Sequence, residues 1–276
     1  MRHNVFSSLG ERPGSLRRKS VRPTSRAADR EQQSRISNIE SGGYPVSADR
    51  VRSLARLYGC ADEALIEALT RMTGGRTRGW WDEYRGEILP AGALDLAEVE
   101  HHAQSMRIAT VVHIPGLLQT PEHARALFRD VVPPLSPPEV EHLVSHRIKR
   151  QAVLYREQPI PLSAVVHETA LRMGFGGPDV ARDQLEYLLT VSEYPHIDLR
   201  VIPFGTGSFP SSGAGIVYFA AEVARLDSVQ VDGDRFEFID TEPQLIKYRA
   251  VLDRLEASAL KPDASRDLVR RIAQSI

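Results

Sequence analysis

The apolar residues of this chain repeat with different periods in its two parts. Between residues 33 and 72 they recur at steps of three and four, as in Val51, Leu54, Ala55 and Tyr58, which is the spacing of an amphipathic helix. From about residue 94 onward, helix-spaced segments are mixed with short β-branched runs. The sequence therefore predicts an α+β protein, with a small all-α N-terminal unit followed by a mixed α/β domain that has flanking helices and a mostly antiparallel or mixed sheet.

The second part contains the elements expected of such a domain. Helices are predicted over 94–106 and 121–130, from about residue 138, within 176–194, and over 242–260 and 261–276. Strands are predicted at 111–114, 162–171, 197–204 and 215–221, with a hairpin at 228–240 around an Asp-Gly turn. The glycine-rich segment 205–215 runs from strand to strand and is interpreted as a hairpin loop, because phosphate-binding glycine loops run from strand to helix.

Residues 33–40, QSRISNIE, form a short predicted helix with two distinct faces. Ile36 and Ile39 fall on one side, where they would pack inward. The opposite face carries hydroxyls and amides, which can donate and accept hydrogen bonds at base edges in a major groove. The residues of this polar face are Gln33, Ser34, Ser37 and Asn38, with Arg35 on the flank. A second helix is predicted from a Ser47 cap to Tyr58, with Gly59 at its end, and a third begins at Asp62.

The stretch QSRISNIESGGYPVSADRVRSLARLYGC resembles the second half of an XRE-type (Cro/cI-like) helix-turn-helix domain. The SRI-x-x-IE-x-G pattern and the L-A-x-L-Y-G word carry this resemblance. In that family the helix that matches 33–40 is the recognition helix. The resemblance implies that Gln33, Ser34, Ser37 and Asn38 face bases, and that phosphates are contacted by Arg35 and by Arg50 or Arg52 on the next helix.

The first half of that domain is degenerate in this sequence. Pro13 and Gly14 interrupt family-like islands, and a proline inside a helix costs about 3 kcal/mol. Pro23 lies near the expected start of the second helix, and beyond it only Ala27 and Ala28 are apolar. Residues 1–32 are therefore interpreted as a basic segment that is either disordered or the remnant of a helix-turn-helix start.

Charge is distributed unevenly, although the net charge of the whole chain is only −1. Residues 1–78 contain fifteen Lys and Arg against eight Asp and Glu, and the remainder contains twenty against twenty-eight. A basic N-terminal part on an acidic body is expected of a protein whose one end meets phosphate. Double-stranded DNA is therefore the predicted partner, bound by a homodimer that reads two half-sites.

Length and composition set the domain organisation. A chain of 276 residues exceeds one typical domain. We expect a helix-turn-helix unit at 33–73, a linker at 74–79 and an α+β domain at 80–276, with Trp80 and Trp81 anchoring the boundary between the two units.

Cys60 is the single cysteine, so no disulfide forms within the chain. Without a secretory leader or an apolar run of about eighteen residues, the protein is expected to be soluble and cytoplasmic, with no membrane partner.

The second part carries a resemblance of its own. WWDEYRGEILP, VVHIPGLLQTPEHARAL and RVIPFGTG are similar to the antitoxin-like domain that follows XRE helix-turn-helices in many actinobacterial regulators. The usual form of the middle segment reads VPGLLQT-x-x-YARA, and here Ile114 replaces the valine and His123 the tyrosine. The resemblance covers most of 80–276. It implies a cytoplasmic regulator of the toxin–antitoxin type, paired with a small protein encoded by a neighbouring gene.

Three groups of polar residues could in principle form a catalytic or metal site. The EVEHH segment at 98–102 offers one Glu-x-x-x-His pair, but a metal needs three or four converging ligands, so we interpret the segment as a solvated helix face. His167 and Glu168 lie on a predicted strand and would point to opposite faces. The 205–215 loop lacks a following helix. We therefore expect no enzyme activity, no catalytic residues, no cofactor and no metal.

Three functions stay open on the sequence alone. The first is a DNA-binding transcriptional regulator that reads DNA with the helix at 33–40. The second is an antitoxin-like protein-interaction module with a decayed helix-turn-helix, whose contact regions would be an exposed GLLQT turn at 116–120 and the 205–215 loop. The third is a ligand-sensing regulator with a small molecule in a pocket of the mixed sheet.

Overall fold

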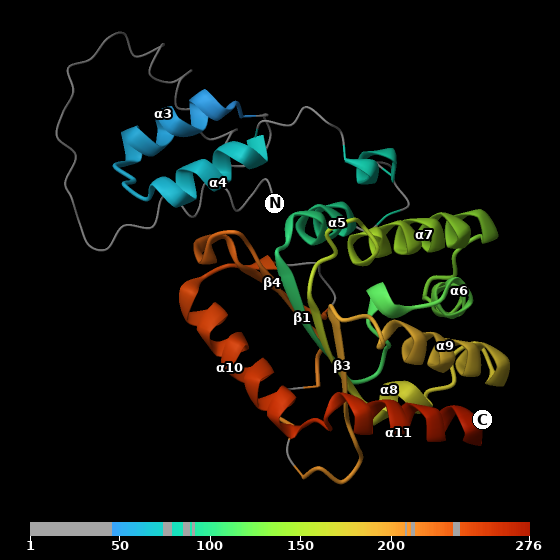
Figure 1. Cartoon of the computed structure of the whole chain (residues 1–276). Helices are drawn as coiled ribbons and strands as arrows, with labels where there is room; N and C mark the ends of the chain where they lie inside the picture. Colours follow the sequence, from blue (N-terminus) through green and yellow to red (C-terminus); the bar gives the residue numbers. More distant parts are fainter. Residues whose placement is uncertain are drawn as a thin grey trace, which may run out of the picture. The chain divides into compact units, whose positions relative to one another are not determined.

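The computed structural model describes residues 46–73, 79–84, 89, 92–207, 209–210, 213–233 and 238–276 (Figure 1). The chain divides into two compact units. The described part of the first unit is 46–73 together with 222–226, and the second unit comprises 79–221 and 227–276. The predicted helix at 33–40 lies outside the described residues.

The first unit contains two amphipathic helices, α3 (Ala48–Tyr58) and α4 (Glu63–Thr73). The side chain of Ser47 caps α3 by accepting a hydrogen bond from the backbone N–H of Arg50 at 3.3 Å. Gly59 ends the helix with φ 66°, a left-handed conformation that glycine adopts without strain. The predicted boundaries of α3 are therefore confirmed. The two helices share a core of Val51, Leu54, Ala55, Leu65, Ile66 and Leu69.

The second unit is built on one mixed sheet of six strands, in the order β3-β2-β1-β4-β5-β6. The strands are β1 (Ser105–Thr110), β2 (Leu162–His167), β3 (Ile197–Ile202), β4 (Ile216–Ala220), β5 (Ser228–Val231) and β6 (Phe238–Ile239). β1, β2 and β3 run parallel, whereas β4, β5 and β6 continue the sheet in antiparallel pairs. The predicted α+β class with a mixed sheet is thus confirmed.

Helices cover both faces of this sheet (Figure 1). They are α5 (Ala93–His102), α6 (Pro121–Arg129), α7 (Pro137–Arg150), α8 (Glu168–Arg172), α9 (Pro178–Val191), α10 (Glu242–Ser258) and α11 (Pro262–Ser275). Short 3-10 helices of this unit are η1 (Trp80–Tyr84), η2 (Gly116–Leu118) and η3 (Gln151–Leu154), whereas η4 (Ala224–Leu226) belongs to the first unit. Leu245, Leu252 and Leu255 of α10 pack on one face of the sheet. On the other side lie α5, α6, α7 and α9.

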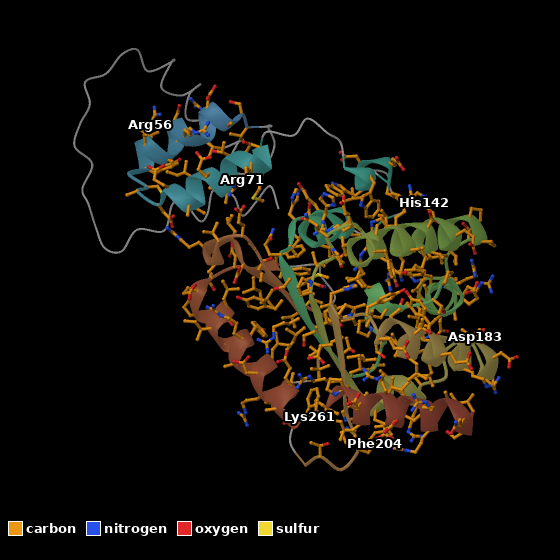
Figure 2. The ribbon with its side chains drawn as sticks, in the orientation of Figure 1. Arg56, Arg71, His142, Asp183, Phe204 and Lys261 are labelled. Atoms are coloured by element: carbon orange, nitrogen blue, oxygen red, sulfur yellow. The ribbon has the colours of Figure 1, made fainter. Side chains whose placement is uncertain are left out.

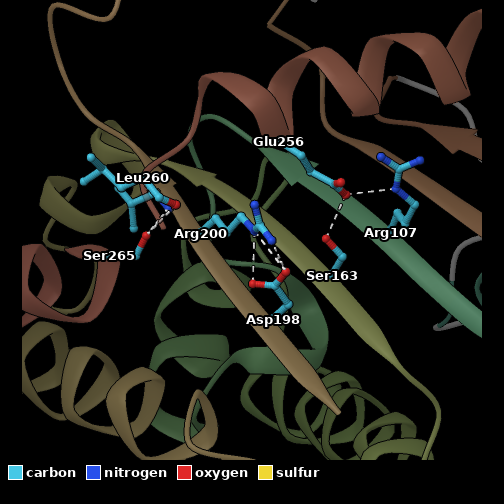
Figure 3. A network of polar contacts seen from close by, with 8 residues as sticks. Arg107, Ser163, Asp198, Arg200, Glu256, Leu260 and Ser265 are labelled. Atoms are coloured by element: carbon cyan, nitrogen blue, oxygen red, sulfur yellow. Dashed lines mark hydrogen bonds and ion pairs between the residues drawn. The ribbon is translucent and has the colours of Figure 1, made fainter. Parts of the chain in front are cut away.

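A polar network stands between the sheet and α10 (Figure 3). Arg107 of β1 and Ser163 of β2 both donate to the same oxygen of Glu256, each at 2.9 Å. Arg107 also pairs with Asp253 at 2.8 Å. Arg200 of β3 pairs with Asp198 of the same strand at 2.7 Å. The arginines of this network therefore each have a carboxylate partner, which lowers the cost of placing half-buried ions here.

Several predicted boundaries are wrong. The first helix ends at His102, and the strand predicted at 111–114 instead occupies 105–110, so the β-branched run VVHI lies in a bend. The strand predicted at 162–171 ends at His167, and Glu168 begins α8. The hairpin interpretation of 205–215 fails because β2 and β1 separate β3 from β4. Among the described helices, none is both long and apolar enough to cross a membrane.

Trp80 and Trp81 both pack within the second unit. Trp81 and Tyr84 are buried, and Trp80 lies edge-on to both rings at 5.9 Å. Trp80 also contacts the ring of His146 on α7 at 5.4 Å. This aromatic cluster fixes η1 against α7.

Candidate ligand pocket

Only two of the residues predicted to contact DNA lie in the described part of the chain. Arg50 and Arg52 are both on α3, where Arg50 is half-buried and Arg52 pairs with Glu67 of α4 at 3.1 Å. A surface ion pair of this kind contributes roughly 0–1 kcal/mol, so it does not prevent Arg52 from reaching a phosphate. Figure 2 shows two further arginines of the unit, Arg56 and Arg71, in the last turns of α3 and α4. The other predicted contacts, Gln33, Ser34, Arg35, Ser37 and Asn38, are outside the described residues.

The second unit contains a pocket of about 570 Å³ between its helices and the face of the sheet opposite α10. Its floor is a row of three side chains from neighbouring strands: Ile108 of β1 faces Val217 of β4, which faces Gln230 of β5. Thr110, two residues after Ile108, extends this row. The walls come from α5, η2, α6 and α7.

A buried ion pair stands in the wall of this pocket. Arg150 of α7 donates two hydrogen bonds to Glu100 of α5, from Nε to Oε2 at 2.8 Å and from Nη2 to Oε1 at 2.6 Å. Both side chains are buried. Because the geometry is bidentate, each ion satisfies the other, which is the condition under which a buried ion pair is tolerated.

Arg147, one turn before Arg150, also lines the pocket but has no carboxylate partner among the residues that the structure describes. Its Nη1 donates to Oε1 of Gln119 at 2.5 Å, and its guanidinium carbon lies 4.9 Å from the centre of the Phe128 ring. Burial and the nearby Arg150 lower the pKa of Arg147 to about 9, while the charges of Glu100 and Asp232 act in the opposite direction. Arg147 therefore keeps its charge at neutral pH, half-buried in the wall of the pocket.

The PGLLQT segment, residues 115–120, positions this arginine. A Cβ on Gly116 would lie 3.2 Å from Nη1 of Arg147, so glycine leaves the room that the guanidinium occupies. Gln119 accepts from Arg147 while its own Nε2 donates to the carbonyl of Ile114 at 2.7 Å. The carbonyl of Gln119 in turn accepts from Nε2 of Gln151 at 2.6 Å. Oε1, Nε2 and the backbone carbonyl of Gln119 thus each make a hydrogen bond that holds the pocket wall.

Gln184 of α9 holds the same segment through two hydrogen bonds. Gln184 donates from Nε2 to the carbonyl of Leu118 and accepts from the backbone N–H of Thr120, both at 2.8 Å. Leu117 and Leu118 are buried completely or almost so. The prediction of an exposed GLLQT turn is therefore wrong: the segment is part of the interior, and it offers no surface to a partner protein.

Aromatic rings form the rim of the pocket on the side of α6. His113 stacks on Phe175 at 5.2 Å with an interplanar angle of 26°. His123, in the place where the resembling family usually has tyrosine, contacts the edge of Phe175 and is buried. Neither ring nitrogen of His123 has a partner among the described residues, and burial lowers its pKa to about 4. His123 is therefore neutral at pH 7.

The sequence did not predict that Glu100, Arg147 and Arg150 form a site. The prediction that 98–102 is a solvated helix face is wrong at Glu100, which is buried. The signal that could have found Glu100 is its place in the helix. It lies four residues after Leu96 and three after Ala97, so it falls on their apolar stripe. Arg147 follows Leu143 and Val144 of α7 in the same way. A charge on the buried stripe of a helix indicates either an ion pair or a binding site.

The described part of the chain holds no group of three or more His, Cys, Asp or Glu that could bind a metal ion. His101 and His102 instead contact Trp81, with ring centres at 5.1 and 6.4 Å. Burial lowers the pKa of both histidines. Cys60 of the first unit is a free thiol that packs against the core of α3 and α4.

Comparison with known proteins yields one match. The family model described as "Domain of unknown function (DUF5753)" matches residues 93–271, a range that contains the whole pocket. No curated protein and no solved structure matches the chain.

Proposed function

Since the chain belongs to the DUF5753 family, and the family domain encloses a pocket with a charged wall, we propose that the protein is a transcriptional regulator that senses a small molecule. In this proposal an XRE-like N-terminal unit reads DNA with the helix at 33–40, as a homodimer in the cytoplasm. The second unit binds the ligand and changes the affinity for DNA. The protein is a binding protein and not an enzyme.

One observation carries the sensing half of the proposal: Arg147 is a half-buried cation in the pocket wall, and no carboxylate of the described chain forms a direct ion pair with it. Removing a charge from bulk water without a direct partner costs free energy. A protein that keeps such a group does so for a reason other than stability. A pocket of this volume lies in the range of about 300–1,000 Å³ that is typical of sites for small molecules.

The DNA-binding half is supported by sequence and by local structure. The resemblance to the XRE family continues through α3, whose cap, length and left-handed end match the predicted pattern. Arg50 and Arg52 lie on this helix, and the N-terminal part of the chain carries an excess of seven positive charges. Such an excess favours contact with phosphate.

Fluorescence anisotropy tests the DNA-binding half. The purified protein is titrated onto its own upstream DNA and onto scrambled DNA of equal length, at two salt concentrations. We expect sequence-dependent binding that falls steeply with salt. Replacing Gln33 or Asn38 with alanine should cost roughly 1–3 kcal/mol per contact, whereas Arg52→Ala should weaken both DNAs equally. Weak binding that is blind to sequence contradicts this half.

A second candidate is an antitoxin-like module that holds a small protein encoded by a neighbouring gene. The observation in its favour is an exposed apolar segment beside the pocket: Val132 is 94% exposed, and Val131 is also exposed. Exposed apolar side chains in a row are typical of interaction sites. Co-purification of the neighbour-encoded protein with wild type, and its loss with a Val131→Ser/Val132→Ser variant, would favour this function.

A further inference from the structure

We propose that the pocket takes a small organic carboxylate with a single negative charge and a flat apolar body. This inference rests on the proposed sensing function and specifies the class of ligand. It is drawn from the charges, the shape and the polar atoms of the pocket wall.

The charge of the pocket wall selects a monoanion. Arg150 and Glu100 cancel in their bidentate pair, which leaves Arg147 as the cation of the wall without a direct ion pair, while Asp130 and Asp232 are exposed carboxylates at the rim. Gln119 occupies one N–H of this guanidinium, and other N–H groups stay available, because a guanidinium has five donors. A carboxylate matches the planar fork of an arginine with two parallel hydrogen bonds. Asp232, exposed at the rim, opposes the entry of ions with more than one negative charge.

The rest of the pocket suits an apolar and planar group. Ile108, Val217, Leu96 and Leu117 supply aliphatic surface on the floor and walls. Phe128 lies against Arg147 on one side, and the stacked pair of His113 and Phe175 stands at the rim. Flat aromatic faces pack well against planar ligands. A ligand whose carboxylate meets Arg147 would place its body on this apolar surface.

The test uses 2-naphthoate as the probe, with 2-naphthamide and acetate as matched comparisons. Binding to the purified full chain is measured by saturation-transfer NMR and by calorimetry. We expect naphthoate to bind at least ten-fold more tightly than naphthamide, which has the same shape without the charge, and more tightly than acetate, which has the charge without the body. Equal binding of naphthoate and naphthamide, or no binding of naphthoate, overturns the proposal.

Variants assign the binding to this pocket. Arg147→Gln should weaken naphthoate at least ten-fold and leave naphthamide unchanged, whereas Arg182→Gln, at an exposed arginine of α9, should change neither. If Arg147→Gln fails to fold, Arg147→Lys serves instead, since it keeps the charge but lacks the planar fork that a carboxylate matches. Naphthoate binding that survives the folded variant contradicts the proposal. Inorganic phosphate and the dipeptide Gly-Phe are titrated as other sources of anion, and tighter binding of either one than of naphthoate contradicts the proposal.

These measurements need no DNA. Loss of sequence-specific DNA binding with intact naphthoate binding would contradict the regulator and leave the ligand class standing. The reverse result would contradict the ligand class alone.

Discussion

The two faces of the central sheet differ in how their arginines are paired with carboxylates. On the face under α10, Arg107 meets Glu256 and Asp253, and Ser163 shares the same carboxylate. On the pocket face, Arg150 is paired but Arg147 has no carboxylate partner in the described chain. Both faces hold arginines that are at least half-buried, so burial alone does not reveal function. The difference between an arginine with a direct carboxylate partner and one without separates a structural network from a candidate binding site.

The largest expected effect comes from breaking the compensated pair of the pocket face. Glu100→Gln removes the partner of a buried arginine and should cost about 3–5 kcal/mol of unfolding free energy, measured by urea denaturation. Glu141→Gln is the matched control, because Glu141 makes a bidentate pair with Arg125 at the surface. That substitution should leave the unfolding free energy nearly unchanged. Equal losses would mean that burial does not decide the value of these pairs.

Acid should weaken the pocket face through its histidines. Burial lowers the pKa of His123 to about 4 and that of His146 to about 3, whereas both titrate near 6.5 in the unfolded chain. The unfolded state therefore binds protons first. Stability is complete above about pH 6.5 and is lost as the pH falls toward 4, by roughly 1–2 kcal/mol per histidine between pH 7 and 5. A His123→Phe/His146→Phe variant should show a flatter dependence in urea melts across this range, and an unchanged slope contradicts the assignment.

The face under α10 should respond more mildly. Arg107→Met removes two ion pairs of a half-buried side chain, and we expect a loss of about 1–2 kcal/mol in the same denaturation assay. Naphthoate binding should be unaffected, since Arg107 faces away from the pocket. A loss of binding in this variant would show that the two faces are coupled and would weaken the comparison.

The smallest effect is expected at Thr110. Thr110→Val has nearly the same shape and removes a buried hydroxyl that lacks a partner, so the unfolding free energy should stay the same or rise by less than about 1 kcal/mol. Naphthoate binding should be unchanged, because Oγ1 is buried away from the open volume of the pocket. A large loss of stability would show that Oγ1 has a structural role instead.

The sequence predicted helices well where a cap marks the boundary. Ser47 and Gly59 delimit α3, and Pro121 occupies the first turn of α6 after the Thr120 cap. The first strand was missed because SMRIAT, at 105–110, contains Arg107 and Ala109 on one face, whereas the more β-branched VVHI follows it in a bend. Local preference favours VVHI, and pairing with β2 and β4 overrides it.

The pocket could not be predicted in the same way. Glu100 and Arg150 are fifty residues apart, and their pairing depends on how α5 and α7 pack. The PGLLQT word was recognised as a signature, but its physical basis lies in side chains that are distant in sequence, Arg147, Gln151 and Gln184. The spacing of apolar residues shows that a charged residue lies on the apolar stripe of its helix. Only the packed structure shows whether an oppositely charged side chain from another element pairs with it.

The edges of the sheet limit how two copies of this protein can associate. The outer strand β3 has the backbone groups of Val201 bonded to α11 and to the segment between α10 and α11. The N–H of Val201 donates to Oγ of Ser265 at 3.0 Å, and its carbonyl accepts from the N–H of Leu260 at 2.9 Å. At the other edge, the described residues of β6 are Phe238 and Ile239. At Val201 the edge of β3 is closed to a further strand, which limits extension of the sheet there. A second copy that paired with β3 along its length would have to break both of these hydrogen bonds.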